Sequence, residues 1–431
     1  MKICMIGSGY VGLVAAIGLA DFGNEVICVD KDKNRIDALN DGQNPIYEIG
    51  LSDLLKRNIE RKRLRFSTDL DFAVKSSLVI FLAVGTPEGE NGNPDLGDLM
   101  AAAEEIGKSL NEYKVIAIKS TVPVGTYKSI IEKISRNTNK PFDVVSNPEF
   151  LREGSAVQDF LLPNRIVLGL SSKRAEEIMR AVYRGLYLIE TPLVITDNAT
   201  AELIKYAANC FLAMKISYIN EMAQLCDHFG ADVVTLAKAV GMDGRIGPKF
   251  LHPSPGFGGS CLPKDISALI SIGNSAGIDM RMASATKQIN QKQRELVIKK
   301  ARQFMPSLEN KNIAILGLSF KQSTDDIRES PSIYVVDRLL REGSNISAYD
   351  PLAADNFRKL FPSIAYAPSA QDACKDADIV IFMTEWNEFR EIDLAKLRKL
   401  MRGDILIDTR NIFLPGSARD AGFRYIGMGR N

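Results

Sequence analysis

MKICMIGSGYVGLVAAIGLADFGNEVICVD, residues 1–30, decides the fold of the N-terminal part of the chain. A short apolar run leads into the glycine-rich segment GSGYVG, a helical run follows, and a second apolar run ends in Asp30. This order of strand, glycine turn, helix and strand is typical of a βαβ unit that starts a parallel sheet. Working outward from it, we expect an α/β domain.

The three glycines of this segment each have a separate physical use. Gly7 permits the tight turn, Gly9 lets the backbone approach a pyrophosphate, and Gly12 lets the helix pack closely on the strand. The start of the helix supplies free amides and a positive dipole end. Because all parts of the fingerprint occur in order, the segment predicts a dinucleotide site.

Asp30 indicates which dinucleotide binds. An acid at the end of the second strand accepts hydrogen bonds from the ribose hydroxyls and disfavours a 2′-phosphate. Lys31 and Arg35 follow nearby and weaken the argument against NADP. The sequence therefore predicts NAD as the cofactor.

The alternation of strand and helix patterns continues to about Thr196. The apolar runs KICMI, EVICVD, LVIFLAV, KVIAIKS, DVVSNPE and RIVLGL are separated by helical patterns. This alternation predicts a doubly wound, Rossmann-like domain over residues 1–196.

The pattern changes after that domain. Residues 197–229 form one helical period without Pro or Gly, too long for a crossover helix, so we expect a spine between domains. Further helices fill a central domain, residues 197–302, interrupted by a Gly- and Pro-rich loop at 241–263. The runs NIAILGLSF, NISAYDP, DADIVIFM and DILIDTRN then predict a second Rossmann-like domain, residues 303–431.

Composition excludes several classes of protein. Lys plus Arg number 54 and Asp plus Glu 53, so no gross charge indicates nucleic acid or membrane as a partner. The N-terminus lacks a signal-peptide pattern, and we expect a soluble, cytoplasmic protein. The six cysteines are scattered without a CxxC pair, which argues against disulfides and against a metal site. Only two histidines are present, so His-based acid/base chemistry is disfavoured.

Cys261 is the candidate nucleophile. It follows the glycines of GFGGSCLPKD and precedes Lys264, whose ammonium favours a thiolate. The other cysteines fit structural positions: Cys4 and Cys28 in strands, Cys210 and Cys226 on the long helix, and Cys374 on a helix before DADIVIFM.

Five polar residues are candidates for the chemistry. Lys205 and Asn209 share one face of the long helix, where the lysine should be half-buried, although a solvated charge is the equal alternative. Glu149 and Glu153 follow the strand DVVSN at the carboxyl edge of the first sheet, where ligands of open α/β sheets bind. Thr121 ends another strand at that edge, where it could also serve only as a turn residue.

A family resemblance rests on motifs across nearly the whole chain. In order these are GSGYVG, STVPVGT, NPEFLREG, ELIKYAANCFLA, GFGGSCLPKD, GLSFKQSTDDIRESP and DTRN. The chain resembles members of the UDP-glucose/GDP-mannose dehydrogenase family. GRIGPKFL, residues 244–251, and the late DTRN favour UDP-glucose as the substrate.

The resemblance implies oxidation of the sugar C6 alcohol to a carboxylate, with two NAD consumed and UDP-glucuronate formed. Cys261 would carry the intermediate as a thiohemiacetal and then as a thioester. Glu149 is the first choice to activate the hydrolytic water, assisted by Glu153 or through Thr121. No released aldehyde is expected.

Further roles follow from the same resemblance. Lys205 and Asn209 would stabilise the oxyanion, and Lys205 or a water held by Asp265 would take the first alcohol proton. Arg245 would reach the substrate of a neighbouring subunit, which implies a homodimer or larger homo-oligomer.

The implied binding residues fall into two sets. The cofactor set is Gly7, Gly9, Tyr10, Val11, Gly12, Asp30, Arg35, Thr86, Thr121, Glu153, Lys264 and Arg328. The substrate set is Glu149, Phe150, Leu151, Arg152, Glu153, Lys205, Asn209, Arg245, Phe250, Leu251, His252, Pro253, Ser254, Gly258, Lys321 and Arg410. Without the resemblance, Lys321, Arg328 and Arg410 would be interpreted as surface charges.

Three alternatives stay open at this level. The same chemistry could act on UDP-N-acetylglucosamine, UDP-N-acetylmannosamine or GDP-mannose. A one-step hydroxyacid dehydrogenase would share the first domain and the helix Lys and Asn, but it has no need for Cys261. A non-catalytic sensor of NAD and a nucleotide sugar would need none of the reactive residues.

Overall fold

The computed structural model describes residues 1–89 and 92–430. These residues form two compact units, 1–208 and 209–431. Within the described residues, no helix combines the length and the apolar character that crossing a bilayer requires.

The first unit is built on an eight-stranded sheet. In spatial order its strands are β3 (Leu64–Ser67), β2 (Glu25–Val29), β1 (Lys2–Ile6), β4 (Val79–Leu82), β5 (Lys114–Ile118), β6 (Phe142–Ser146), β7 (Ile166–Gly169) and β8 (Leu193–Thr196). The strands are parallel apart from the pairing of β6 with β7, which is antiparallel at Ser146 and Gly169. The expected doubly wound domain is confirmed, with this one reversal.

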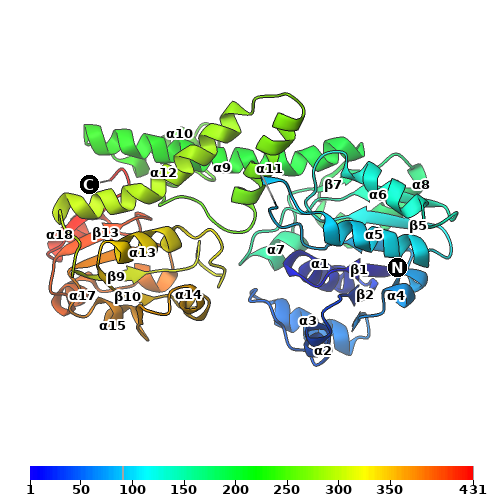
Figure 1. Ribbon diagram of the computed structural model, residues 1–431, viewed down its shortest axis with the longest axis horizontal. Helices are drawn as coiled ribbons and strands as arrows, with labels where there is room; N and C mark the ends of the chain where they lie inside the picture. Colours follow the sequence, from blue (N-terminus) through cyan, green and yellow to red (C-terminus); the bar gives the residue numbers. More distant parts are fainter. Residues whose placement is uncertain (90–91, 431) are drawn as a thin grey trace. The chain divides into compact units, whose positions relative to one another are not determined.

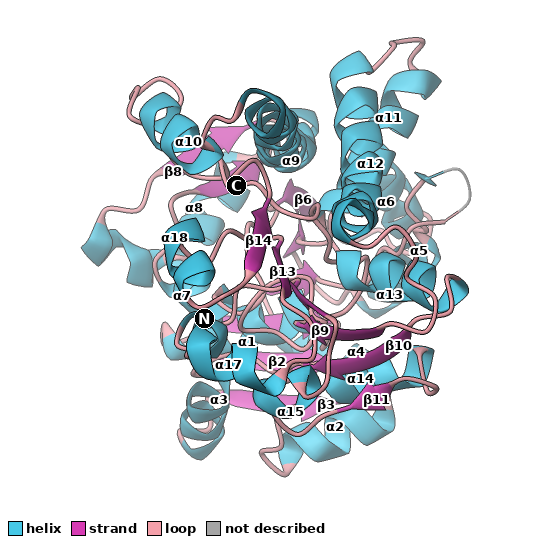
Figure 2. Ribbon diagram, turned by 90° about the vertical axis from the view of Figure 1, so that its left-hand side faces the viewer, coloured by secondary structure: helices cyan, strands magenta, loops and turns pink. Residues whose placement is uncertain are grey.

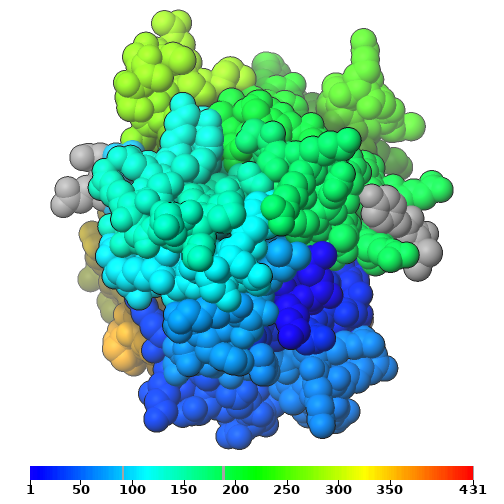
Figure 3. Space-filling view, turned by 90° about the vertical axis from the view of Figure 1, so that its right-hand side faces the viewer, coloured from blue at the N-terminus to red at the C-terminus, as the bar shows by residue number. Residues whose placement is uncertain are grey.

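Helices cover both faces of this sheet. They are α1 (Tyr10–Asp21), α2 (Lys33–Asn40), α3 (Leu51–Glu60), α4 (Leu70–Ser76), α5 (Gly97–Ser109), α6 (Thr126–Ser135), α7 (Ala156–Leu161), α8 (Lys173–Val182) and the 3-10 helix η2 (Arg184–Ile189). One core lies under α1, α3 and α7, and a second under α4, α5 and α6. The space-filling view shows residues of this unit at the surface, coloured from blue through cyan to green (Figure 3).

Helix α9 (Asn198–Phe229) is one continuous element of 32 residues, drawn in green in Figure 1. The predicted spine helix is thereby confirmed within one residue of its expected start. The second unit continues with α10 (Val233–Gly241), α11 (Leu262–Ser275) and α12 (Arg281–Phe304). No helix or strand interrupts the described residues between α10 and α11, as the Gly- and Pro-rich loop predicted.

A second, six-stranded parallel sheet follows, and Figure 2 shows its strands side by side. Its spatial order is β11 (Ala365–Tyr366), β10 (Asn345–Tyr349), β9 (Asn312–Leu316), β12 (Ile379–Phe382), β13 (Ile405–Asp408) and β14 (Arg424–Gly427). Its helices are α13 (Pro331–Arg341), α14 (Ala354–Leu360), α15 (Ala370–Cys374), α16 (Asn387–Arg390), α17 (Leu394–Leu400) and α18 (Pro415–Asp420). The second Rossmann-like domain is confirmed.

Four strands lack a counterpart among the apolar runs of the sequence: β3, β8, β11 and β14. All four are edge strands of their sheets. A central strand is covered on both faces and therefore consists of consecutive apolar residues, whereas an edge strand is short and partly exposed. β3, for example, alternates buried and exposed residues over its four positions.

The same kind of turn follows the first strand of each sheet, β1 in the first and β9 in the second. Gly7 and Gly317 both have positive φ, 103° and 99°, and each donates its N–H to the end of the neighbouring strand at 2.8 Å. Asp30 and Asp350 accept the next N–H in each case, at 2.7 Å. The helix α1 begins three residues after Gly7, but α13 begins only at Pro331. Only the first turn therefore places a helix N-terminus directly at the sheet edge.

Gly12 is the glycine that this packing needs most. A Cβ at Gly12 would lie 2.0 Å from the carbonyl oxygen of Gly7, whereas a Cβ at Gly9 would meet nothing within 4 Å. We expect Gly12→Ala to destabilise the first unit by about 1–3 kcal/mol or more, since backbone must shift. Gly9→Ala should stay within about 0.5 kcal/mol of the parent. Urea unfolding followed by circular dichroism measures both, and equal losses would contradict this account.

Candidate functional site

The glycine turn and Asp30 form one hydrogen-bonded arrangement. The Asp30 carboxylate accepts from the backbone N–H and the hydroxyl of Ser8, both at 2.7 Å. Burial acts to raise the pKa of Asp30, but the hydrogen bonds from Ser8 hold it below its usual range. Asp30 is therefore a fixed anion at the carboxyl end of β2, as a ribose acceptor requires.

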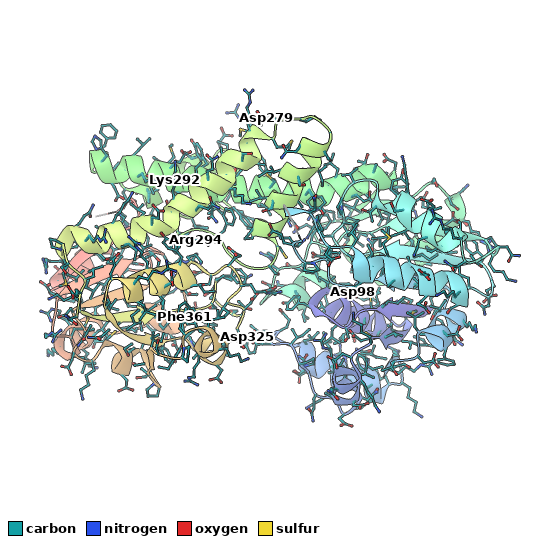
Figure 4. All side chains as sticks on the ribbon, viewed as in Figure 1. Asp98, Asp279, Lys292, Arg294, Asp325 and Phe361 are labelled. Atoms are coloured by element: carbon teal, nitrogen blue, oxygen red, sulfur yellow. The ribbon has the colours of Figure 1, made fainter. Side chains whose placement is uncertain are left out.

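The cations beside Asp30 are already engaged. Lys31 donates to Asp98 on α5 at 2.7 Å, and Asp98 is labelled in Figure 4. Arg35 lies 3.9 Å from the Asp30 carboxylate itself. Each cation thus has a carboxylate beside it that would compete with a 2′-phosphate, and this favours NAD over NADP.

The start of α1 is suited to an anion. In the described structure no side chain caps this helix, whose N-cap residue is Gly9, and the space beside Gly9 is open. Uncapped amides at a helix N-terminus bind phosphate groups. The residues present therefore fit a dinucleotide pyrophosphate.

Thr86 and Thr121 tie together two loops at the same edge of the sheet. The Thr86 hydroxyl donates to the backbone carbonyl of Thr121 at 2.9 Å. These loops follow β4 and β5, which are neighbouring parallel strands. The two predicted cofactor residues are thus in direct contact.

A buried ion pair joins the helix α9 to the loop after β6. Lys205 Nζ lies 2.6 Å from Glu149 Oε1, and the two side chains are only 4% and 5% exposed. The prediction of a half-buried lysine was wrong, because the loop covers its ammonium completely. Burial acts to raise the pKa of Glu149, but the Lys205 ammonium holds it below the usual range.

A small hollow opens beside Glu149. Lys119 lines it, and burial lowers the pKa of this lysine to about 8. Arg165 also lines it, with its guanidinium 3.5 Å from the centroid of the Phe150 ring. Three cations, Lys119, Arg165 and Lys205, therefore surround one carboxylate, and this excess of positive charge suits a site where an oxyanion develops.

Glu202 precedes Lys205 by one turn of α9 and was missed by the sequence analysis. Its carboxylate accepts the backbone N–H groups of Gly125 at 2.6 Å and Tyr127 at 3.0 Å, and the Ser146 hydroxyl at 3.3 Å. Burial raises its pKa to about 7. The spacing of three residues from Lys205 on an otherwise apolar face was the signal that could have found it.

The second unit holds the predicted nucleophile loop in place through amide side chains. Asn220 on α9 accepts from the Ser254 N–H at 2.8 Å, and Asn290 on α12 accepts from the Phe257 N–H at 2.8 Å. Phe250 has a positive φ of 66°, which is strained for a residue with a side chain. Buried contacts therefore order this loop, and it is not a freely exposed surface loop.

Cys261 lies at the end of this loop, as the N-cap residue of α11. One turn into the helix, Asp265 accepts from Asn209 Nδ2 at 2.6 Å and from Lys264 Nζ at 2.7 Å. Its side chain is 1% exposed. The structure thus brings four predicted residues, Cys261, Lys264, Asp265 and Asn209, to one helix start.

A segment of the C-terminal domain that carries predicted site residues approaches the same loop. A Cβ at Gly258 would lie 2.3 Å from the carbonyl oxygen of Glu329, next to Arg328. Arg294 on α12, labelled in Figure 4, donates to that Glu329 carbonyl at 3.3 Å. Arg410 donates to the Phe320 carbonyl at 2.9 Å, beside Lys321.

Other predicted residues have local partners or are solvent-exposed. Arg328 pairs with Asp326 at 2.7 Å and Arg152 with Asp159 at 2.6 Å. Arg245 is 89% exposed and pairs with Asp243 two residues earlier. Within the described part of the chain, the hydrogen bonds and ion pair of Arg245 go to Asp243, so this chain alone does not bring Arg245 to the other predicted site residues.

The six cysteines all lie in described residues and no disulfide joins them, and Cys4, Cys28, Cys226 and Cys374 are buried. Among the described residues, no group of three or more His, Cys, Asp or Glu side chains is placed to hold a metal ion.

Comparison with known proteins places these features in a family context. The NAD binding domain of the UDP-glucose/GDP-mannose dehydrogenase family matches residues 1–187, its central domain residues 199–292 and its UDP binding domain residues 314–415. The chain is 47% identical to the UDP-glucose 6-dehydrogenase of Rhizobium meliloti, over 100% of both chains. It is 43% identical to UDP-glucose 6-dehydrogenase TuaD of Bacillus subtilis, over 100% of this chain and 93% of the relative.

Similarity extends to a solved structure. The UDP-glucose dehydrogenase of the archaeon Pyrobaculum islandicum superposes with a TM-score of 0.93 at 34% identity, over 100% of this chain and 98% of the other.

Removing one member of the buried ion pair should leave a buried charge without its partner. We expect Lys205→Met to lower the free energy of unfolding by about 3–5 kcal/mol. The matched control is Lys75→Met, which breaks the exposed Lys75–Asp71 pair and should cost at most about 1 kcal/mol. Urea unfolding measures both, and a loss for Lys205→Met no larger than the control would contradict the assignment.

Glu202 should make stability depend on pH. Its pKa of about 7 in the folded chain lies above the ordinary value of 4.5, so the folded state binds the proton more tightly. The stabilisation from this proton is complete below pH 4.5 and is lost as the pH rises through 7. We expect Glu202→Gln to reduce the fall in Tm between pH 5 and pH 8. Glu60→Gln, at an exposed position, is the control and should follow the parent.

Proposed function

Because this chain belongs to the UDP-glucose/GDP-mannose dehydrogenase family, we propose that it oxidises C6 of UDP-glucose to the carboxylate of UDP-glucuronate. The observation that carries the proposal is the arrangement of Cys261 at the start of the helix that carries Lys264 and the buried Asp265, which also accepts from Asn209. A single alcohol oxidation needs no such thiol, whereas taking an aldehyde on to an acid needs a covalent adduct. The 47% identity with the Rhizobium meliloti enzyme supports UDP-glucose as the sugar nucleotide.

The cofactor site of the proposal is the first glycine turn. Gly7, Gly9 and Gly12 shape the turn, the uncapped start of α1 would hold the pyrophosphate, and Asp30 would hold the ribose. NAD, when bound there, accepts one hydride in each of two successive oxidations. Tyr10 and Val11 begin α1, and Thr86 and Thr121 lie in the loops after β4 and β5, which supports their predicted place in this site.

The first oxidation removes a hydride and a proton from the alcohol. We assign the proton to the neutral amine form of Lys205, which becomes the ammonium, or to a water held by Asp265, since each is a polar group placed on or beside α9. The Cys261 thiolate then adds to the aldehyde carbon, and a thiohemiacetal forms. The carbonyl oxygen carries the charge that Lys205 and Asn209, four residues apart on α9, would stabilise.

The second oxidation and the hydrolysis complete the reaction. Loss of a second hydride from carbon and of the proton from the hydroxyl turns the thiohemiacetal into a thioester. Water adds to the thioester carbonyl, the carbon–sulfur bond breaks, and the carboxylate leaves as the thiol is regenerated. Glu149 would orient this water, with Glu153 or Thr121 in support, because its lowered pKa keeps it an acceptor.

The proposal assigns substrate recognition to two sets of residues. In the first unit it assigns the loop that carries Glu149 and Glu153, and in the second unit the loop at 250–258 with Lys321 and Arg410, because cations and amides bind pyrophosphate and sugar groups. Arg328 and Lys264 are assigned to the cofactor. We retain the predicted division into domains 1–196, 197–302 and 303–431, which the three family segments support.

The proposal includes a homodimer or larger assembly. Helix α9 exposes Phe211, Tyr218 and Leu225, which lie seven residues apart and therefore form one apolar stripe. Exposed apolar stripes of this kind are typical of helix–helix interfaces. The Arg245 side chain is almost fully exposed, which suits the predicted contact with a neighbouring subunit's substrate.

The proposal is tested by counting products. We expect two NADH for each UDP-glucose consumed, and Cys261→Ser should lower the rate of UDP-glucuronate formation at least about 1000-fold. Cys210→Ser, a partly exposed thiol on α9, is the matched control and should keep both the ratio and most of the rate. A ratio of one NADH would contradict the mechanism.

Initial rates on a panel of sugar nucleotides separate the remaining alternatives. Preference for UDP-N-acetylglucosamine, UDP-N-acetylmannosamine or GDP-mannose would keep the chemistry and change the substrate. NAD binding with no NADH from any of them would favour a sensor.

A further inference from the structure

One carboxylate in the first unit connects two loops that the sequence separates widely. Glu48 lies in the segment between α2 and α3, and its side chain is buried. Glu48 Oε2 accepts the N–H of Gly154 at 2.8 Å, and Oε1 accepts the N–H of Ala156 at 2.8 Å. The Tyr10 hydroxyl donates to the same Oε2.

Tyr10 completes a closed set of contacts. Besides donating to Glu48, its hydroxyl accepts from the Gly154 N–H at 3.2 Å. Burial and the neighbouring carboxylate both raise the pKa of Tyr10, so the phenol keeps its proton and continues to donate. An ionised carboxylate can only accept, and here all of its partners are donors.

The positions of these residues give the contacts a meaning. Tyr10 is the first residue of α1 and directly follows Gly9, at the helix start assigned above to the pyrophosphate. Gly154 directly follows Glu153, in the loop that also carries Glu149. The other end of that loop is fixed by the Lys205–Glu149 pair. Glu48 therefore connects Tyr10, next to the glycine turn, to the C-terminal end of the loop at 149–156.

We propose that Tyr10 and Glu48 are positioning residues that couple occupation of the glycine turn to the arrangement of the loop at 149–156. The inference rests on the proposed function for the identity of the two ligands. A dinucleotide that orders the start of α1 also orders Tyr10, and through Glu48 the backbone at Gly154 and Ala156. By linkage, the cofactor and the sugar nucleotide then strengthen each other's binding by the same factor.

The proposal suits a reaction with two oxidations. The cofactor has to be exchanged once while the sugar is attached to Cys261. The connection would loosen the loop at 149–156 when the glycine turn is empty and order it again when a dinucleotide binds. The ordered loop would then be favoured in complexes that hold both the dinucleotide and the sugar nucleotide.

A purely structural role makes a different prediction. Glu48 also satisfies the N-terminus of α7, because Ala156 is the first residue of that helix. Loss of a cap alone would lower stability and leave the two binding equilibria independent. The decisive quantity is therefore the ratio of two dissociation constants and not Tm.

The test uses NADH with UDP-glucose, a pair that cannot turn over. NADH fluorescence gives the Kd of NADH for the whole chain without UDP-glucose and at saturating UDP-glucose. We expect the parent to bind NADH about five-fold or more tightly in the presence of the sugar nucleotide. Tyr10→Phe and Glu48→Gln should bring this ratio close to one.

Tyr113→Phe is the matched control. The Tyr113 hydroxyl also donates to a carboxylate, that of Asp143 at 2.5 Å, but neither residue lies in the two loops. This variant should keep the parental ratio. Tyr10→Phe removes one hydroxyl and keeps Glu48 on both backbone N–H groups, so it remains informative if Glu48→Gln fails to fold.

Two outcomes would overturn the inference. One is a parental ratio of one, and the other is a parental ratio retained in Tyr10→Phe. Either result together with two NADH per UDP-glucose in turnover overturns the coupling alone. Absence of NADH formation from UDP-glucose and of any UDP-glucose binding overturns the proposed function instead.

Discussion

The buried pair of Lys205 and Glu149 is the interaction on which the carboxyl edge of the first sheet depends. The loop after β6 has no regular structure of its own until α7, and Lys205 fixes its first acidic residue against α9. Three polar positions on α9, Glu202, Lys205 and Asn209, follow a helical spacing of three and four residues. Each makes a different buried contact: with the start of α6, with Glu149, and with Asp265.

Such contacts are better explained by geometry than by stability. A buried ion pair gains little net free energy, because the desolvation of both charges offsets most of the attraction. What the pair provides is a single position for each group, and the hydrogen-bonded set around Asp265 has the same property. The excess of cations near Glu149 adds a field that favours negative charge at that edge. Several residues that the proposed chemistry requires, namely Lys205, Glu149 and Asp265, are therefore held in one position by buried contacts.

The two Rossmann-like sheets show how one architecture supports two kinds of site. Their strand orders correspond, and the turns at Gly7 and Gly317 have the same backbone form. In the first, a helix starts at once and offers its amides to an anion. In the second, a segment of irregular backbone comes before α13 and carries Lys321 and Arg328. After the glycine turn, the second domain therefore presents charged side chains, whereas the first domain presents the backbone amides of a helix.

The sequence by itself determined the central strands, the glycine turn, the length of α9 and the position of Cys261 at the end of a Gly- and Pro-rich loop. Each of these features corresponds to a local pattern: an apolar run, a glycine spacing or an unbroken helical period. Such patterns are local because the buried positions of a helix or strand recur at a fixed spacing along the sequence. Only the tertiary structure decided the edge strands, the full burial of Lys205, and the contacts of Glu48, Lys119 and Glu202. Glu48 and Gly154 are 106 residues apart, and no periodicity connects them. A hydrogen bond between distant segments depends on where the folded chain brings them, and that information is absent from any local pattern.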